Sequence, residues 1–116
     1  MNNSIHPCIW FDGNAKEAAE FYCSVFANAK ITTDTPMLVN FEIWGKKFMG
    51  LNGGPMFKIN PSISIFVYCK TVEQTDEIYN GLAAGGEPLM AIGKYEWSER
   101  YGWIKDKYGL TWQIML

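Results

Sequence analysis

The segment IWFDGNAKEAAEFYCSVFAN, residues 9–28, recurs in outline 57 residues later as FVYCKTVEQTDEIYNGLAAG, residues 66–85. Both copies begin with a short apolar or aromatic run that predicts the end of a β-strand. Both continue with apolar residues at the spacing of an amphipathic helix, and both reach a residue suited to a left-handed C-cap, Asn28 or Gly85. Because these features agree at one offset, the sequence predicts two similar structural units.

The start of each predicted helix carries the pattern of a capping box. Asn14 and Thr71 are the predicted N-caps, and Glu17 and Gln74 follow them by three residues. In a capping box the cap side chain accepts a hydrogen bond from the backbone N–H three residues later, and the second side chain accepts one from the cap residue's N–H. We therefore expect both helices to be capped locally.

Three strand-like runs follow each predicted helix. One of them alternates in polarity, with Val39, Phe41 and Ile43 on one face and Leu38, Asn40, Glu42 and Trp44 on the other. Such alternation is typical of a strand with one buried face. The runs are residues 29–33, 37–44 and 46–52 in the first half and residues 88–94, 100–106 and 110–116 in the second.

This order predicts an α+β fold of two βαβββ modules, about residues 4–53 and 61–116, within a single domain. The joint between them is the segment 53–62, which holds two Gly and two Pro. Each module is expected to form a curved sheet with its helix on the convex side, so that the sheets enclose a cleft. Because such modules leave sheet edges open, we expect a homodimer in which a second copy covers them.

Composition and charge argue against several classes of partner. The net charge is −2 and the Lys and Arg residues are scattered, so the basic face of a nucleic-acid-binding protein is not expected. No run approaches the ~20 consecutive apolar residues of a membrane span. The N-terminal residues lack the build of a signal peptide, which predicts a cytoplasmic protein. Three cysteines without the spacing of a metal or disulfide site predict reduced thiols.

Three stretches carry a resemblance to a known family: WFDGNAKEAAEFY (10–22), LNGGP (51–55) and GWIKDKYGLTWQI (102–114). They resemble the PhnB-like group of the vicinal oxygen chelate superfamily, which includes glyoxalase I, extradiol dioxygenases and bleomycin-resistance proteins. Many members of this group carry the label 3-demethylubiquinone-9 3-methyltransferase domain. Methyl transfer is nevertheless not expected, because Gly53 and Gly54 precede a loop and not the helix that would follow a cofactor-binding glycine turn.

The resemblance also implies where a divalent metal would bind. Catalytic members of the superfamily hold one between side chains from the first and last strands of each module. His6, the chain's only histidine, is near the first of these positions, and Gln113 is at the fourth. The other two positions offer Met49 and either Ile63 or Ser64, which are poor ligands for hard or borderline cations. We therefore expect no tightly bound metal, with His6 and Gln113 as the candidate ligands of a weakly held one.

Other interpretations of these two residues stay open. His6 is also consistent with a surface histidine near the chain terminus, and Gln113 with an amide that bridges neighbouring strands. The chain is rich in aromatic residues, which favour flat or aromatic ligands but are also needed to fill small curved sheets. The candidate ligand-binding residues are Cys8, Trp10, Trp44, Asn52, Ser64 and Trp103.

Two classes of function follow. The first is a protein that binds a small aromatic or hydrophobic molecule in the cleft, without catalysis. The second is a metal-dependent enzyme of the lyase, isomerase or dioxygenase type that uses His6 and Gln113 as ligands.

Overall fold

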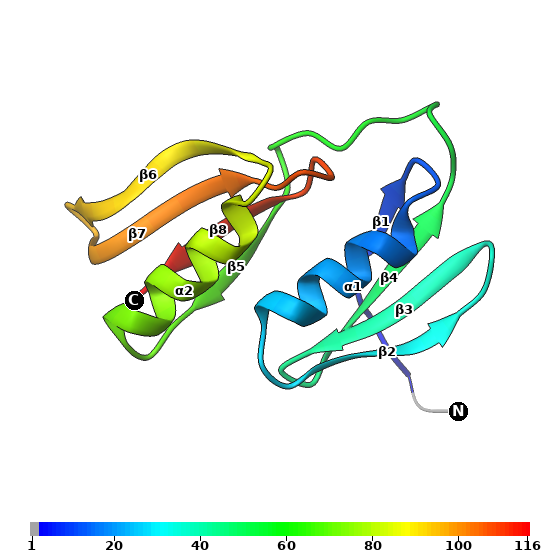
Figure 1. Ribbon diagram of the computed structural model, residues 1–116, viewed down its shortest axis with the longest axis horizontal. Helices are drawn as coiled ribbons and strands as arrows, with labels where there is room; N and C mark the ends of the chain where they lie inside the picture. The colour runs from blue at the N-terminus through cyan, green and yellow to red at the C-terminus, as the bar shows by residue number, and fades with distance from the viewer. Residues whose placement is uncertain (1–2) are drawn as a thin grey trace. The chain divides into compact units, whose positions relative to one another are not determined.

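The computed structural model describes residues 3–116 and contains the predicted repeat as two successive units (Figure 1). The chain divides between Ile59 and Asn60, and each unit is described by itself. The first unit consists of β1 (Cys8–Phe11), α1 (Ala15–Val25), β2 (Ala29–Asp34), β3 (Leu38–Ile43) and β4 (Lys46–Asn52). The second consists of β5 (Ser64–Tyr68), α2 (Val72–Ala83), β6 (Glu87–Tyr95), β7 (Ser98–Lys105) and β8 (Thr111–Met115).

Each unit forms a mixed four-stranded sheet with the same topology. The strand order is β1-β4-β3-β2 in the first sheet and β5-β8-β7-β6 in the second. The first and last strands of each unit pair in parallel, whereas the remaining pairs are antiparallel. The predicted α+β fold of two βαβββ modules is thereby confirmed.

The helix of each unit covers one face of its own sheet. In the first unit Val39, Phe41 and Ile43 are buried on that face, which confirms the predicted alternation of β3. The ring of Phe41 stacks on that of Phe48 at 5.3 Å between centroids. Gly50 permits a close approach of α1, because an added Cβ would lie 3.2 Å from the Cβ of Ala15. Burial of this apolar surface is the main source of stability of the unit.

The core of the second unit combines one large aromatic side chain with aliphatic ones. Trp112 and Ile114 of β8, Ile104 of β7 and Leu82 of α2 are all almost fully buried. Gly102 makes room for the helix, since a Cβ at that position would lie 2.4 Å from the ring of Tyr79.

The two helices begin differently, which corrects part of the capping prediction. Thr71 caps α2 as predicted, with its hydroxyl oxygen accepting the N–H of Gln74 at 3.0 Å. The side chain of Asn14 makes no capping hydrogen bond, so that prediction was wrong. Instead Asn52 Oδ1, at the end of β4, accepts the N–H of Ala15 at 2.9 Å. A residue distant in sequence therefore caps α1.

Asn28 and Gly85 have the predicted left-handed conformation, with φ of 56° and 76°. The C-caps themselves are Phe26 and Ala84, so Gly85 directly follows the end of its helix, whereas Asn28 lies further beyond the end of α1. A hairpin joins β3 and β4. Its two turn residues, Trp44 and Gly45, have φ of 51° and 77°, the positive values of a type I′ turn.

The second unit closes its last hairpin around a buried carboxylate. Asp106 is only 2% exposed, and its Oδ1 accepts the backbone N–H of Tyr108 at 2.8 Å and of Leu110 at 3.2 Å. Its Oδ2 accepts the indole N–H of Trp112 at 2.8 Å. Asp is common in turns for this reason, because its side chain accepts hydrogen bonds from nearby backbone N–H groups.

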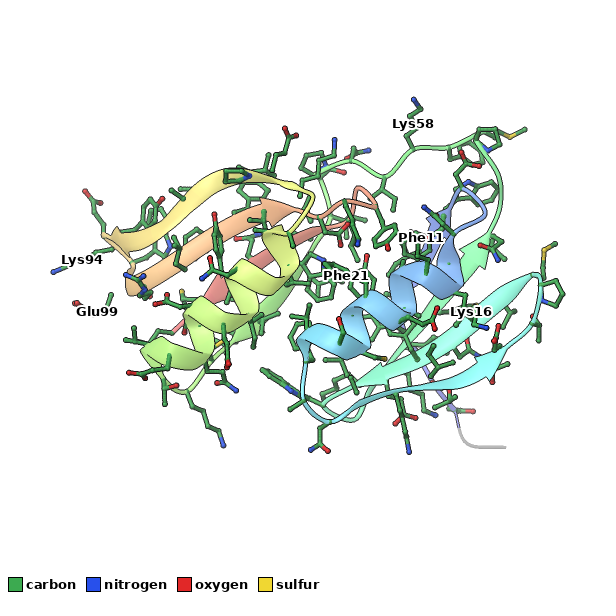
Figure 2. All side chains as sticks on the ribbon, viewed as in Figure 1. Phe11, Lys16, Phe21, Lys58, Lys94 and Glu99 are labelled. Atoms are coloured by element: carbon green, nitrogen blue, oxygen red, sulfur yellow. The ribbon has the colours of Figure 1, made fainter. Side chains whose placement is uncertain are left out.

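The segment between Gly93 and Trp103 forms the β6–β7 hairpin. Lys94 and Glu99 lie together near its tip, with 3.8 Å between Lys94 Nζ and Glu99 Oε1 (Figure 2). Among residues 3–116, neither helix is long and apolar enough to cross a membrane.

Candidate functional site

The face of each sheet opposite its helix is called here the open face of that unit. On the second unit, strand alternation and register place Ser64, Phe66, Tyr101, Trp103 and Gln113 on the open face. On the first unit the open face includes Cys8 and Trp10 of β1, Asn40 and Glu42 of β3, and Lys47 and Met49 of β4.

The amide of Gln113 bridges three strands of the second sheet. Its Oε1 accepts the phenolic O–H of Tyr101 on β7 at 2.6 Å, and its Nε2 donates to Ser64 Oγ on β5 at 2.7 Å. In this arrangement the amide oxygen of Gln113 faces β7 and its nitrogen faces β5. Because Ser64 Oγ accepts from Gln113, its own hydrogen remains available to donate.

Trp103 lies directly across from Gln113 in the β7–β8 register. Its indole Nε1 is buried and has no hydrogen-bond partner in the described part of the chain. A buried donor without an acceptor costs about 1–3 kcal/mol, so such atoms are uncommon in folded proteins and often mark a site of function. An unsatisfied N–H therefore lies buried within the second open face, across from the amide of Gln113.

Aromatic rings surround these polar groups. Phe66 and Tyr68 are 42% and 68% exposed, and their ring centroids are 4.9 Å apart. Tyr95 and Trp97 both contact the ring of Tyr101, at 5.5 Å and 5.3 Å between centroids. Burial, and secondly the neighbouring Tyr95, raises the pKa of Tyr101 above its ordinary value of 10.0. The phenol is therefore a neutral donor to Gln113 at physiological pH.

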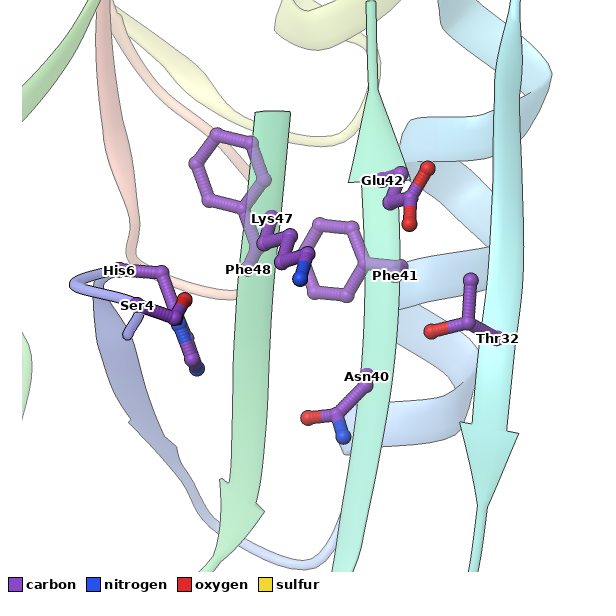
Figure 3. Close-up of a pocket in the computed structure, with 8 residues that line it drawn as sticks. All are labelled: Ser4, His6, Thr32, Asn40, Phe41, Glu42, Lys47 and Phe48. Atoms are coloured by element: carbon purple, nitrogen blue, oxygen red, sulfur yellow. Dashed lines mark hydrogen bonds between the residues drawn. The ribbon is translucent and has the colours of Figure 1, made fainter. Parts of the chain in front are cut away.

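The first open face carries a pocket of about 340 Å³ (Figure 3). Asn40 lies in it, and its Oδ1 is buried without a hydrogen-bond partner among the described residues. Asn40 pairs with Met49 on β4, as Trp103 pairs with Gln113 on β8, so the two unpartnered atoms occupy equivalent positions in the two modules. The pocket is lined by Ser4, His6, Thr32, Asn40, Phe41, Glu42, Lys47 and Phe48.

The side chains at the metal-binding positions that the family resemblance implies are poorly suited to hold a metal ion. His6 is half-buried just before β1, with its Nδ1 3.1 Å from Ser4 Oγ. Met49 offers only a thioether, and the polar atoms of Ser64 and Gln113 bond to each other. Within residues 3–116 no three His, Cys, Asp or Glu side chains form a group that could hold a metal ion. His6 and Gln113 belong to different units, and their joint role as ligands stays a prediction.

Two other predicted site residues of the first unit have structural contacts. Trp10 donates its indole N–H to the carbonyl of Gly54 at 2.8 Å and packs edge-on against Phe57. Asn52 uses both ends of its amide, since Nδ2 donates to the carbonyl of Pro36 at 3.0 Å while Oδ1 caps α1.

The other two predicted ligand-binding residues of the first unit, Cys8 and Trp44, lie in different places. Cys8 is exposed at the start of β1, and no disulfide joins it to Cys23 or Cys69. Trp44 was expected on the face of β3 that carries Asn40. It lies instead in the turn after the strand, where its ring packs against Phe26. The positive φ at Trp44 breaks the strand alternation on which that expectation was based.

Sequence reasoning did not identify two of the residues that shape these faces. Asn40 was recognised as one polar member of an alternating strand, but its lack of a partner depends on neighbours from β2 and β4. Tyr101 was counted only among the aromatic residues. Its signal in the sequence is weak, because the bond to Gln113 joins different strands.

Comparisons with known proteins agree with this architecture. The family described as 3-demethylubiquinone-9 3-methyltransferase matches residues 3–115. A solved structure of the PhnB protein from Bacillus cereus is 32% identical, with 98% of this chain and 99% of that chain covered and a TM-score of 0.90. No protein with a curated description matches the chain significantly.

More distant structures share the fold. Protein PA1353 from Pseudomonas aeruginosa is 21% identical, with 98% of this chain and 97% of that chain covered and a TM-score of 0.86. The fosfomycin resistance protein FosX from Listeria monocytogenes, solved with Mn(II) and sulfate, is 16% identical over 99% of this chain and 90% of that chain, with a TM-score of 0.74.

Proposed function

The chain belongs to the PhnB-like family described as 3-demethylubiquinone-9 3-methyltransferase, whose fold is that of the vicinal oxygen chelate proteins, and we propose that it binds a flat aromatic molecule on its second open face. The proposal is of a binding protein and not of an enzyme. The observation that carries it is the buried, unpartnered indole N–H of Trp103 on a face otherwise lined by aromatic rings.

The polar groups favour a ligand with a hydrogen-bond acceptor. Trp103 Nε1 can only donate, and the Ser64 hydroxyl has its hydrogen available because Gln113 already donates to its oxygen. The rings of Phe66 and Tyr68 offer apolar surface and edges for stacking. A ring system with a neutral carbonyl oxygen satisfies both requirements, with the oxygen at Trp103 and the rings over Phe66.

Methyl transfer finds no support in the geometry. An enzyme that uses a nucleotide-containing cofactor typically binds it at a glycine-rich turn between a parallel strand and a helix. Here the strand-to-helix turns contain Asp12, Gly13 and Asn14 in one unit and Cys69, Lys70 and Thr71 in the other. Only one glycine is present across both turns, and the sheets are largely antiparallel.

The test compares two naphthalenes that differ in a single atom. In 2-acetylnaphthalene the side chain carries a carbonyl oxygen, which 2-isopropenylnaphthalene replaces by CH₂. We expect the ketone to bind at least about tenfold more tightly, since a donor that finds an acceptor gains about 1.4 kcal/mol or more. The indole N–H resonance of Trp103, identified by its loss in Trp103→Phe, should move only with the ketone.

A matched variant separates the donor from general aromatic contact. Trp103→Phe should bring the affinities for the two naphthalenes together, whereas Trp44→Phe, in the turn of the first unit, should leave their ratio unchanged. Equal affinities in the unaltered protein, or binding of neither compound, would refute the proposal.

The metal-dependent alternative has its own measurement. Thermal unfolding with nickel, zinc, manganese or ferrous ions should show no increase in melting temperature if the protein is a metal-free binding protein. Stabilisation that is lost in His6→Ala and reduced in Gln113→Ala would make the enzyme the better proposal, and hemithioacetals and catechols would then be the substrates to screen.

A further inference from the structure

We propose that the pocket on the first open face is a second binding site, specific for a small zwitterion that carries an ammonium and a carboxylate group, as a free amino acid does. This site is distinct from the aromatic face of the second unit in its residues and in its chemistry. It is formed by side chains of β2, β3 and β4 together with Ser4 and His6.

The first observation is the amide of Asn40. Its Oδ1 is buried and unpartnered within residues 3–116, although the pocket beside it is large enough for a small molecule. An amide oxygen accepts hydrogen bonds, so the missing partner must be an N–H or O–H group. An apolar side chain of similar size at this position would avoid the cost of the unpaired oxygen. A donor on a ligand explains why an amide is there.

The second observation is a pair of opposite charges that do not meet. Glu42 and Lys47 are cross-strand neighbours in the β3–β4 register, and both line the pocket. Cross-strand neighbours of opposite charge often pair. In the described part of the chain, however, the four ion pairs within 4.0 Å include neither residue. Both charges are therefore available to a ligand.

The arrangement assigns one end of the ligand to each charge. Figure 3 shows Thr32 on one side of Asn40, and Ser4 and His6 on the other. Asn40 Oδ1, the Glu42 carboxylate and the Thr32 hydroxyl belong to residues that line this pocket, and each is an acceptor for a hydrogen of an ammonium group. The ammonium of Lys47 is the group for a carboxylate.

The same charges discriminate against simpler ions. A metal or an amine alone would be repelled by Lys47, and a carboxylate alone would be repelled by Glu42. Only a ligand with both signs meets an opposite charge at each end. The pocket thus selects a ligand that carries two opposite charges. The second open face instead selects an aromatic ligand that carries a neutral hydrogen-bond acceptor.

The test is a titration of the full chain with L-alanine, followed by backbone amide resonances in ¹⁵N-labelled protein. We expect shifts that saturate and that are confined to the first unit, centred on Thr32, Asn40, Glu42 and Lys47. Propionate and propylamine, which each lack one charged group, should bind at least about tenfold more weakly. Comparable affinity for either of these compounds, or no saturable shift with L-alanine, would overturn the proposal.

Variants assign the affinity to particular groups. Asn40→Leu and Glu42→Gln should each weaken L-alanine binding about tenfold or more. Glu42→Gln, at a half-exposed position, serves if Asn40→Leu disturbs folding. Lys47→Met should also weaken L-alanine binding about tenfold or more. Lys30→Met is the matched control and should leave binding unchanged. Lys30 also neighbours Glu42 across strands, but it does not line the pocket. Unchanged binding in Asn40→Leu or Lys47→Met would contradict the assigned contacts.

Discussion

The two units share one topology but stabilise the start of the helix and the last hairpin through different contacts. In the second unit the cap of α2 is local, from Thr71 to a residue three positions later. In the first unit the cap of α1 comes from Asn52, 37 residues further along the chain. The last hairpins also differ, because a two-residue turn closes the first and a turn around buried Asp106 closes the second.

This difference shows that a repeated fold does not require repeated interactions. A backbone N–H at a helix start needs an acceptor, but any nearby side chain can supply it. The first unit uses a cap that exists only after β4 has reached the helix, whereas the second uses one that can form with the helix itself. Variants at the caps and at Asp106 test that contrast.

The largest effect is expected at Asp106. Asp106→Ala removes the acceptor of three hydrogen bonds, one of them from the buried indole N–H of Trp112. We expect a loss of about 4 kcal/mol in the free energy of unfolding, since bonds to a charged group contribute about 1.5–3 kcal/mol each and do not add fully. Urea unfolding gives the value, with Asp12→Ala, at an exposed turn of the first unit, as the control. A loss below that of the control would contradict the role assigned to the carboxylate.

Asn52→Ala should have the next largest effect. It removes the cap of α1 together with the hydrogen bond to Pro36, and about 2 kcal/mol should be lost. Asn14→Ala is the critical comparison, because Asn14 occupies the N-cap position without using its side chain there. Hydrogen exchange at the amide of Ala15 should accelerate in the first variant and stay unchanged in the second. The reverse result would mean that the helix is capped locally after all.

Thr71→Ala should cost about 1 kcal/mol, the usual value of a lost local cap. Its effect on amide exchange should be confined to the first turn of α2, because the lost bond joins Thr71 only to Gln74. Thr71→Ser keeps the hydroxyl and should keep most of the stability. An effect of Thr71→Ala on the strands as large as that of Asn52→Ala would remove the contrast between local and distant capping.

The smallest expected effect depends on pH. Because burial raises the pKa of Tyr101 above the 10.0 of the unfolded chain, its contribution to stability is complete below that pH and decreases as pH rises through the folded pKa. Tyr101→Phe should therefore reduce the loss of stability between neutral and alkaline solution. Burial also raises the pKa of Tyr79, so part of the alkaline loss should remain in that variant. An identical loss with and without the Tyr101 hydroxyl would show that this phenol is not what titrates.

The sequence was sufficient to predict the fold, because the patterns that indicate helices, strands and turns are local. Helix periodicity, the alternation around Phe41 and the left-handed residues at Asn28 and Gly85 all depend on neighbours along the chain. The cap from Asn52 could not be predicted in the same way, since it needs the parallel pairing of β1 and β4 to bring it to Ala15. Local pattern alone assigned that role to Asn14.

The candidate sites were less accessible to prediction for a related reason. Gln113 is a polar residue in an apolar strand, which marks it as unusual in the sequence. Its hydrogen-bond partners could not be predicted in the same way, because they lie on β5 and β7. Whether Asn40 or Trp103 lacks a partner depends on every group that surrounds it in space. The shared cleft, the homodimer, the bound small molecule and the cytoplasmic location all stay predictions.

The unequal burial of the three thiols gives the protein a natural attachment point for a reporter group. Cys8 is exposed on the first open face, whereas burial raises the pKa of both Cys23 and Cys69 and so lowers their thiolate fraction. One equivalent of a maleimide dye at neutral pH will thus modify Cys8 first, with no engineered cysteine. A fluorophore placed there sits on the sheet that carries the polar pocket, so occupancy of that module can be followed optically.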